Sequence, residues 1–336
     1  MLIDGGIGAD LKAAADSARR AEEEGYDAVW TAEVGHDPFL ALTLAAEHTR
    51  RIGLGTGIAV AFGRSPMTLA HTAWDLNAYA EGRFLLGIGS QVKAHIEKRY
   101  SMPWSHPAAR MREFILAMRA IWDCWQNGTK LDFRGDFYTH TLMTPFFHPG
   151  SNPFGAPRVF LAAVGEGMTR VAAGVADGLL VHGFTTERYL REVTVPTVRE
   201  ELERAGRRRD QFELSYPAFV VTGDTEEQMA LADTGVRKQI AFYASTPAYR
   251  PVLELHGWGE LQGELNLLSK QGEWDEMGRR ISDEVLDAFA VQGSPDEVAG
   301  LLHARFADMI DRVSLYMPYH DPGVVPRIVA GLRSNA

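Results

Sequence analysis

Residues 53–61, Gly53-Leu54-Gly55-Thr56-Gly57-Ile58-Ala59-Val60-Ala61, place three glycines within five positions of an apolar, strand-like run. Glycine weakens a strand because it costs backbone entropy and leaves no side chain to pack. The pattern therefore indicates that a flat ligand approaches the main chain, that the backbone is strained, or that neighbouring side chains need room. Similar pairs recur at Gly87-Ile88-Gly89 and Gly165-Glu166-Gly167. If all three segments end parallel strands of one barrel, they line a single mouth that suits a planar cofactor.

On both sides of this stretch, short apolar runs alternate with longer amphipathic runs, which is typical of repeated strand–helix units. Strands are predicted at residues 2–4, 27–32, 53–61, 84–89, 158–163, 178–182, 213–221 and 311–317. Helices are predicted at residues 10–24, 38–49, 66–80, 108–127, 168–176, 186–205, 225–243 and 322–333. The count predicts an α/β fold, a closed (β/α)₈ TIM barrel, since the doubly wound alternative usually has only about five to seven strands.

One barrel over residues 1–336 is expected, with insertions at residues 128–157 and 244–290. The first insertion is rich in proline and aromatic residues, and the second carries aromatic and charged residues. Long insertions on a barrel usually form lids or packing surfaces.

The overall composition argues against nucleic acid and membranes as partners. The chain has 34 basic and 44 acidic residues, a net charge of −10 and no basic tract, so nucleic acid is not an expected partner. No signal-like start and no run of about 18 apolar residues occurs, so no membrane association is expected. A single cysteine, Cys124, lies in a helical stretch and is expected to be buried, which fits a cytoplasmic location.

Common catalytic motifs are missing from this sequence. The glycines of residues 53–57 do not open a helix directly, as the Rossmann dinucleotide fingerprint requires, because four more apolar residues follow Gly57. No His-x-His follows the first strand and no Cys-x-x-Cys occurs, so no metal site is predicted. Gly-x-Ser-x-Gly, the esterase motif, is also absent.

Polar residues after predicted strands are the better candidates for function, because the catalytic face of a barrel lies at the carboxyl ends of its strands. Glu33, His36 and Asp37 follow the second strand, although Asp37 precedes Pro38 and is expected to cap a helix. His95 follows the fourth strand, where a histidine could contact a ring or move a proton. A surface histidine is the alternative.

Aromatic residues near the expected mouth suggest a small apolar or aromatic substrate. Trp104 and His106 lie between the fourth strand and the helix at 108–127, and Tyr249 and Trp258 lie in the second insertion. Packing of a lid or of the core is the competing explanation for all four.

Four segments, residues 25–33, 54–66, 82–90 and 161–178, follow one another in the order found in a known enzyme family. Through them the chain resembles the luciferase-like flavin and deazaflavin oxidoreductases, and within them the actinobacterial branch that uses coenzyme F420. The resemblance implies a barrel enzyme, commonly a homodimer, that transfers a hydride between the deazaflavin C5 and a small substrate. An FMN-dependent monooxygenase and a non-catalytic flavin-binding protein are the alternatives.

The resemblance also implies positions for the cofactor. A bulge with a cis peptide bond falls on Gly57-Ile58, and the phosphate contacts fall on residues 163–165, where a following helix N-terminus suits a phosphate. The acidic tail of F420 would favour nearby cations, for which Arg64, Lys93, Lys98 and Arg99 are candidates, with solvated surface charge as the alternative role. The implied cofactor contacts are Thr56, Gly57, Ile58, Gly89, Ser90, His95, Ala163, Val164, Gly165 and Gly167.

The proton-transfer residue departs from the family pattern. Several relatives carry an acidic residue followed by histidine after the second strand, whereas here Glu33 matches the acidic position and Val34 replaces the histidine. His36 lies two residues further on. Glu33, His36 and His95 are therefore the candidate catalytic residues.

Overall fold

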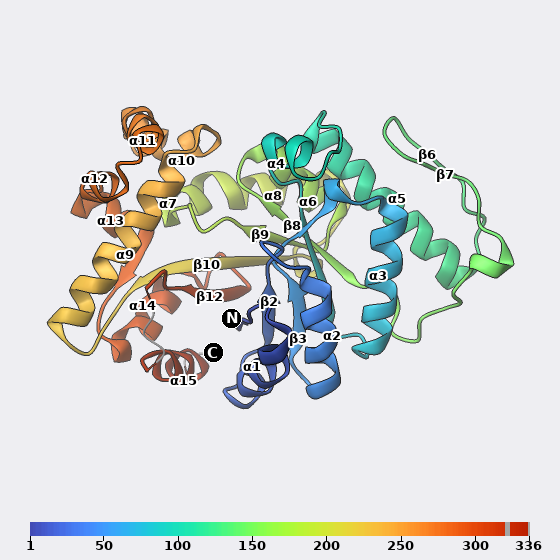
Figure 1. Ribbon diagram of the computed structural model, residues 1–336, viewed down its shortest axis with the longest axis horizontal. Helices are drawn as coiled ribbons and strands as arrows, with labels where there is room; N and C mark the ends of the chain where they lie inside the picture. Colours follow the sequence, from blue (N-terminus) through green and yellow to red (C-terminus); the bar gives the residue numbers. More distant parts are fainter. Residues whose placement is uncertain (320–322, 335–336) are drawn as a thin grey trace.

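The computed structural model describes residues 1–319 and 323–334, and within these residues eight parallel strands close into a barrel surrounded by helices (Figure 1). The predicted barrel is confirmed. Its strands are β1 (Leu2–Gly6), β2 (Ala28–Thr31), β3 (Gly53–Thr56), β5 (Phe84–Gly89), β8 (Arg158–Ala163), β9 (Gly178–Val181), β10 (Glu213–Val221) and β12 (Arg312–Tyr316). β12 pairs with β1, and β9 pairs with β10, so the sheet closes.

Each predicted helix is found, either between two of these strands or, for the last helix, after β12. The helices are α1 (Leu11–Glu23), α2 (Pro38–His48), α3 (Pro66–Tyr79), α5 (Pro107–Asn127), α6 (Glu166–Val175), α7 (Glu187–Tyr189), α8 (Val195–Arg204), α9 (Glu226–Ala244) and α15 (Val325–Ser334). A π-helical segment, Leu190–Thr194, joins α7 to α8. Residue 322, where the last helix was predicted to begin, lies outside the described residues.

Local capping chemistry explains where several helices begin. Asp37 accepts a hydrogen bond from the backbone N–H of Phe39 at 2.8 Å, which confirms its predicted role as a cap of α2. Ser65 accepts from the N–H of Thr68 at 3.1 Å and precedes Pro66 at the start of α3.

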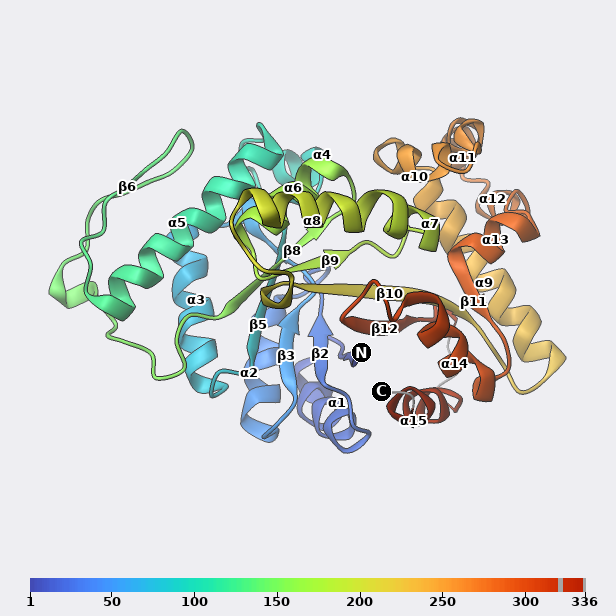
Figure 2. The ribbon, with the colours of Figure 1, turned by 180° about the vertical axis from the view of Figure 1, so that it is seen from behind.

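The further elements belong mainly to the segments expected as insertions. Residues 128–157 contain the hairpin β6 (Phe133–Arg134) and β7 (Thr139–His140), which projects beyond α5. Residues 244–290 contain α10, α11, α12 and α13, which gather on the opposite side of the barrel (Figures 1 and 2). The remaining bounds are β4 (Ala59–Val60), α4 (Lys93–Lys98), α10 (Arg250–Glu254), α11 (Gly259–Gln271), α12 (Trp274–Arg279), α13 (Asp283–Phe289), β11 (Ala290–Gln292) and α14 (Pro295–Phe306).

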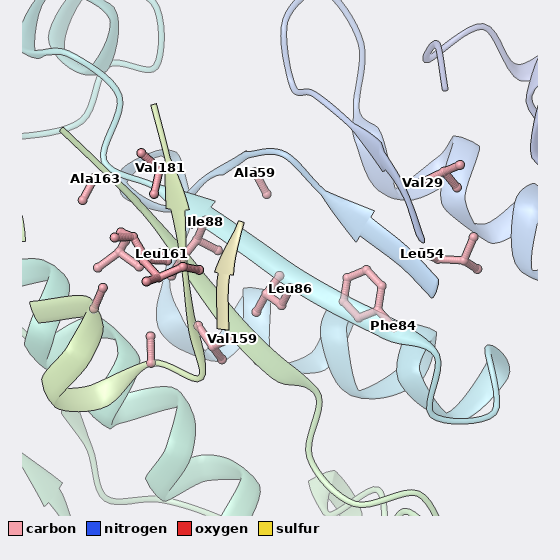
Figure 3. Close-up of a cluster of buried hydrophobic side chains, with 14 of the residues drawn as sticks. Val29, Leu54, Ala59, Phe84, Leu86, Ile88, Val159, Leu161, Ala163 and Val181 are labelled. Carbon is pink, nitrogen blue, oxygen red and sulfur yellow. The ribbon is translucent and has the colours of Figure 1, made fainter. Parts of the chain in front are cut away.

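The hydrophobic core lies between the barrel and its helices, because alternate strand residues point to opposite faces of the sheet. Figure 3 shows Leu86 and Ile88 of β5 beside Leu161 of β8 in this layer, and all are fully buried. The intervening residues point inward, where Leu85 and Phe160 form a smaller cluster inside the barrel. Cys124 is buried, as predicted. Among the described residues, no helix combines the length and apolarity needed to cross a bilayer.

Packing inside the barrel accounts for part of the glycine pattern. A Cβ atom at Gly55 would lie 2.3 Å from the ring of Trp30, and one at Gly87 would lie 1.8 Å from the carbonyl oxygen of Thr56. These glycines make room for a neighbouring ring and a neighbouring strand. Gly57 and Gly89 lie closer to the carboxyl ends of the strands, where the barrel opens.

Candidate active site

A cavity of about 1390 Å³ opens at the carboxyl ends of the barrel strands. Gly57, Gly89 and Gly165 all line it, so the glycine segments that stand apart in the sequence do meet at one mouth. Since β5 stands four places from β12 in the order around the barrel, residues after these strands face each other across the opening. The cavity therefore has two chemically different walls.

The first wall, here called the bare wall, consists of Gly57-Ile58, Gly89-Ser90 and residues 163–165. The peptide bond between Gly57 and Ile58 is cis, as the family resemblance implies. Small residues leave much of this wall as main chain. A planar group could rest against exposed peptide here without meeting bulky side chains.

Gly165 is the residue at which the bare wall meets a helix. It caps α6, and a Cβ atom placed on it would meet nothing within 4 Å. Its φ of −95° is open to any residue, so neither packing nor backbone conformation requires glycine there. The first amide N–H groups of a helix have no partner within the helix and favour an anion. The N-terminus of α6 can therefore receive a phosphate group.

The second wall, here called the tyrosine–histidine wall, consists of His182, Tyr243, Tyr249 and Tyr316, all of which line the cavity. His182 directly follows β9, and Tyr316 ends β12. Tyr243 lies near the end of α9, and Tyr249 lies in the second insertion. Nε2 of His182 is 3.2 Å from the hydroxyl of Tyr249, and the hydroxyls of Tyr243 and Tyr316 are 2.7 Å apart.

Burial keeps the tyrosine–histidine wall uncharged near neutral pH. It lowers the pKa of His182 to about 4 and raises the pKa of Tyr249 to about 12. Burial, followed by the hydrogen bond to Tyr316, also raises the pKa of Tyr243 well above its usual value. The pKa of Tyr316 is raised by burial as well. The wall offers neutral donors and acceptors rather than ions.

Glu33 occupies a different place from the one expected of a proton donor. Its carboxylate accepts hydrogen bonds from the backbone N–H of Val60 at 2.8 Å, from Arg64 at 2.6 Å and from the hydroxyl of Tyr100 at 2.9 Å. It does not line the cavity among the described residues. Arg64 also pairs with Asp37 at 3.1 Å, so this cation is engaged within the protein. The contacts indicate that Glu33 supports the bulge between β3 and β4.

The structure separates the other predicted site residues into those at the cavity and those away from it. Tyr249, Ile58, Ser90, Ala163 and Val164 line the cavity. Thr56 is buried beneath it and donates to the carbonyl oxygen of Gly87 at 2.7 Å. The remaining predicted residues lie outside the cavity. Four of them are exposed: His36, His95, His106 and Gly167. The other two pack against aromatic neighbours, Trp104 against Phe62 and Trp258 against His256.

Three residues of the tyrosine–histidine wall were missed from the sequence. His182 was open to detection, because it is a polar residue directly after a predicted strand, the same signal that singled out Glu33. Tyr243 and Tyr316 carry no comparable signal, since one reads as part of a helix and the other as part of a strand.

Comparisons with known proteins agree with this geometry. Residues 3–312 match the family model described as luciferase-like monooxygenase. An uncharacterized protein of Mycobacterium tuberculosis is 57% identical over 313 residues, which is 93% of this chain and 92% of the relative. The 5,10-methylenetetrahydromethanopterin reductase of Archaeoglobus fulgidus is 29% identical over 287 residues, which is 83% of this chain and 81% of the reductase.

A solved structure supports the fold. The coenzyme F420-dependent tetrahydromethanopterin reductase of Methanopyrus kandleri has a TM-score of 0.79 and 20% identity, and the match covers 98% of this chain and 97% of that one. Since the family model covers most of the chain, the protein belongs to the luciferase-like monooxygenase family and is an enzyme of that family.

Proposed function

We propose that this enzyme is an F420-dependent oxidoreductase that transfers a hydride between the deazaflavin C5 and a small organic substrate. The observation that carries the proposal is the bare wall, which ends at a helix N-terminus whose capping glycine has open space where a side chain would stand. The reductases of A. fulgidus and M. kandleri support it, because the second is named as F420-dependent.

The residues present fit this cofactor. Gly57, Ile58 and Gly89 would hold the ring, and Ala163, Val164 and Gly165 would hold the phosphate at the start of α6. Glu166 lies in the first turn of α6, but Arg170 lies 3.7 Å from its carboxylate and offsets that charge. When bound, F420 supplies a carbon that accepts or releases a hydride.

The chain's own part in the reaction is to bind, orient and exclude water. Met168, Leu180 and Val181 add apolar surface to the cavity beside the bare wall. Tyr316, at the end of β12, would face the substrate from across the opening, whereas His182 lies next to residues 163–165 because β9 pairs with β8. With Glu33 engaged by Arg64 and Tyr100, we assign it to support of the bulge rather than to proton transfer.

Equilibrium binding of F420 and FMN, followed by fluorescence quenching, tests the proposal. F420 is expected to bind at least about tenfold more tightly than FMN. Gly165→Val should weaken F420 binding by about tenfold or more, because its side chain fills the phosphate site, while the unfolding midpoint changes only slightly, since an added Cβ meets no protein atom and valine merely caps α6 less well than glycine. Gly263→Val is the matched control, because Gly263 also has nothing within 4 Å of an added Cβ but lies on α11, away from the cavity.

The other outcomes separate the alternatives. Tight binding of FMN with negligible binding of F420 would favour an FMN-dependent monooxygenase. Negligible binding of both cofactors would overturn the proposal. Tight F420 binding without turnover of any electron acceptor would favour a flavin-binding protein without catalytic activity.

A further inference from the structure

The hydrogen bonds around His182 define its tautomer. The backbone N–H of Phe184 donates to Nδ1 of His182 at 3.0 Å, so Nδ1 carries a lone pair rather than a proton. Because burial holds the pKa of His182 at about 4, the ring is neutral near pH 7. Its single N–H proton is therefore on Nε2.

This tautomer determines what Tyr249 can do. The Nε2–H of His182 donates to the hydroxyl oxygen of Tyr249, whose own O–H hydrogen is left over. Among residues 1–319 and 323–334 this hydroxyl has no other hydrogen-bond partner. The ring is held in place by stacking on Phe184, with 5.7 Å between centroids and 26° between planes. Tyr249 thus presents a positioned O–H donor at the cavity.

The pair formed by Tyr243 and Tyr316 adds a second donor. Two hydroxyls 2.7 Å apart share one hydrogen, and the other hydrogen stays available to a ligand. Tyr316 is fixed by stacking on Phe219, with 4.7 Å between centroids and 19° between planes. The wall therefore offers O–H donors that stay protonated, since burial raises the pKa of each tyrosine.

None of the charged residues that line the cavity belongs to the tyrosine–histidine wall. Of the described residues that line the cavity, Asp4, Arg20 and Glu24 carry a carboxylate or guanidinium group. Asp4 is bound to Arg312 inside the barrel, whereas Arg20 belongs to α1 and Glu24 caps its C-terminal end, outside the barrel. A carboxylate or phosphate placed against the tyrosines would lose hydration without gaining a counter-ion beside it. A neutral oxygen would gain a hydrogen bond.

We propose that the substrate is an uncharged ketone or the matching secondary alcohol, whose oxygen accepts a hydrogen bond from Tyr249, with His182 as the residue that positions Tyr249. This inference rests on the proposed function. In the direction of reduction, the carbonyl carbon receives the hydride, its π electron pair moves to oxygen, and the oxygen takes a proton from water. The reduced deazaflavin loses two electrons with the hydride and returns a proton to water, so the alcohol is the balanced product.

The test compares two probes of similar shape, acetophenone and benzoate, for binding to the F420-loaded enzyme by ligand-observed NMR. Acetophenone is expected to bind at least about tenfold more tightly than benzoate. Tyr249→Phe should weaken acetophenone binding roughly 3- to 10-fold, the value of one hydrogen bond, and leave F420 binding unchanged. Tyr79→Phe, on the exposed face of α3, is the control and should change neither affinity.

A second variant tests the positioning role of His182. In His182→Asn the side-chain oxygen can still accept from the N–H of Phe184, but the donor to Tyr249 is lost. Acetophenone binding should fall, but by less than in Tyr249→Phe. In the wild type, ¹⁵N NMR should show the His182 proton on Nε2 near neutral pH.

The outcomes distinguish this inference from the proposed function. Four results would each overturn the inference while F420 binding stands. They are undetectable acetophenone binding, benzoate bound as tightly as acetophenone, a Tyr249→Phe variant that behaves like Tyr79→Phe, and a proton on Nδ1 of His182. Loss of F420 binding in the wild type would instead count against the proposed function.

Discussion

His182 combines a buried position with a side chain that titrates near neutral pH, so its protonation is coupled to folding. Its pKa lies near 6.5 in the unfolded chain and at about 4 in the folded protein, because burial disfavours the charged ring. Between these values the unfolded chain binds more protons. Above about pH 6.5, His182 therefore does not reduce the free energy of unfolding. As the pH drops from there toward 4, the free energy of unfolding decreases by roughly 3 kcal/mol in all.

The pH dependence of unfolding measures this coupling. Urea unfolding at about pH 7.5 and about pH 4.5 should show a smaller loss of stability for His182→Asn than for the wild type, by about 2 kcal/mol. Burial also lowers the pKa values of His140 and His256. These two histidines therefore lower the stability at acidic pH in the wild type and in His182→Asn alike. His48→Gln, on the exposed end of α2, is the control. Parallel pH profiles for His182→Asn and the wild type would contradict the coupling.

Single residues were also the hardest feature to predict from the sequence. The resemblance and strand-end positions indicated Gly57, Gly89 and Gly165 correctly as lining one opening, because backbone position alone decides that. Side-chain roles depend on partners distant in sequence. Glu33 meets Arg64 and Tyr100, 31 and 67 residues away, and these contacts occupy the carboxylate that its strand-end position seemed to leave free.

At the scale of elements, the bulge between β3 and β4 is held by the segment that follows β2. The N–H of Gly57 donates to the carbonyl of Thr31 at 2.8 Å, and the N–H of Glu33 donates to the carbonyl of Ile58 at 3.1 Å. The carboxylate of Glu33 then accepts from the N–H of Val60. Glu33 thus supports the bare wall through its backbone bond to Ile58 and its carboxylate bond to Val60, without lining the cavity itself.

Substitution of Glu33 separates a supporting role from a catalytic one. Glu33→Gln should lower the free energy of unfolding by about 1–3 kcal/mol, because Arg64, with 17% of its side chain exposed, loses the nearer of its two carboxylate partners and keeps only Asp37. F420 affinity should fall as the bulge loosens. Asp16→Asn, which breaks the exposed pair with Arg19, is the control and should leave stability nearly unchanged. Full stability and full F420 affinity combined with lost turnover would instead restore Glu33 as a catalytic residue.

For the whole molecule, the alternation of apolar and amphipathic runs was sufficient to predict the barrel, because each strand–helix unit is a local pattern. The insertions were predicted from the excess length of two segments over the repeat, and the helices and the hairpin within these segments were not predicted. The homodimer implied by the family resemblance stays a prediction. The side-chain contacts that close the barrel were beyond local patterns, since they join residues from the two ends of the chain.

The buried ion cluster at this closure joins the first strand to the last. Asp4 of β1 accepts from Nε and Nη2 of Arg312 of β12 at 2.8 and 2.7 Å, and it also accepts from the indole N–H of Trp30 at 2.9 Å. Arg312 reaches Glu213 of β10 at 3.1 Å as well. The exposed fractions of the Arg312 and Asp4 side chains are only 5% and 0%.

A double-mutant cycle on this pair tests whether it secures the closed barrel. Arg312→Met should lower the free energy of unfolding by about 3–5 kcal/mol, because it leaves the buried Asp4 without a cation. Asp4→Leu should cost less, because Arg312 keeps its ion pair with Glu213. The double variant should lose clearly less than the sum of the two, since no charge remains unpaired. Asp308→Asn, at the exposed pair with Arg191, is the control and should leave the urea midpoint nearly unchanged. Additive losses in the double variant would mean that Asp4 and Arg312 act independently and that backbone pairing of β1 with β12 closes the barrel without them.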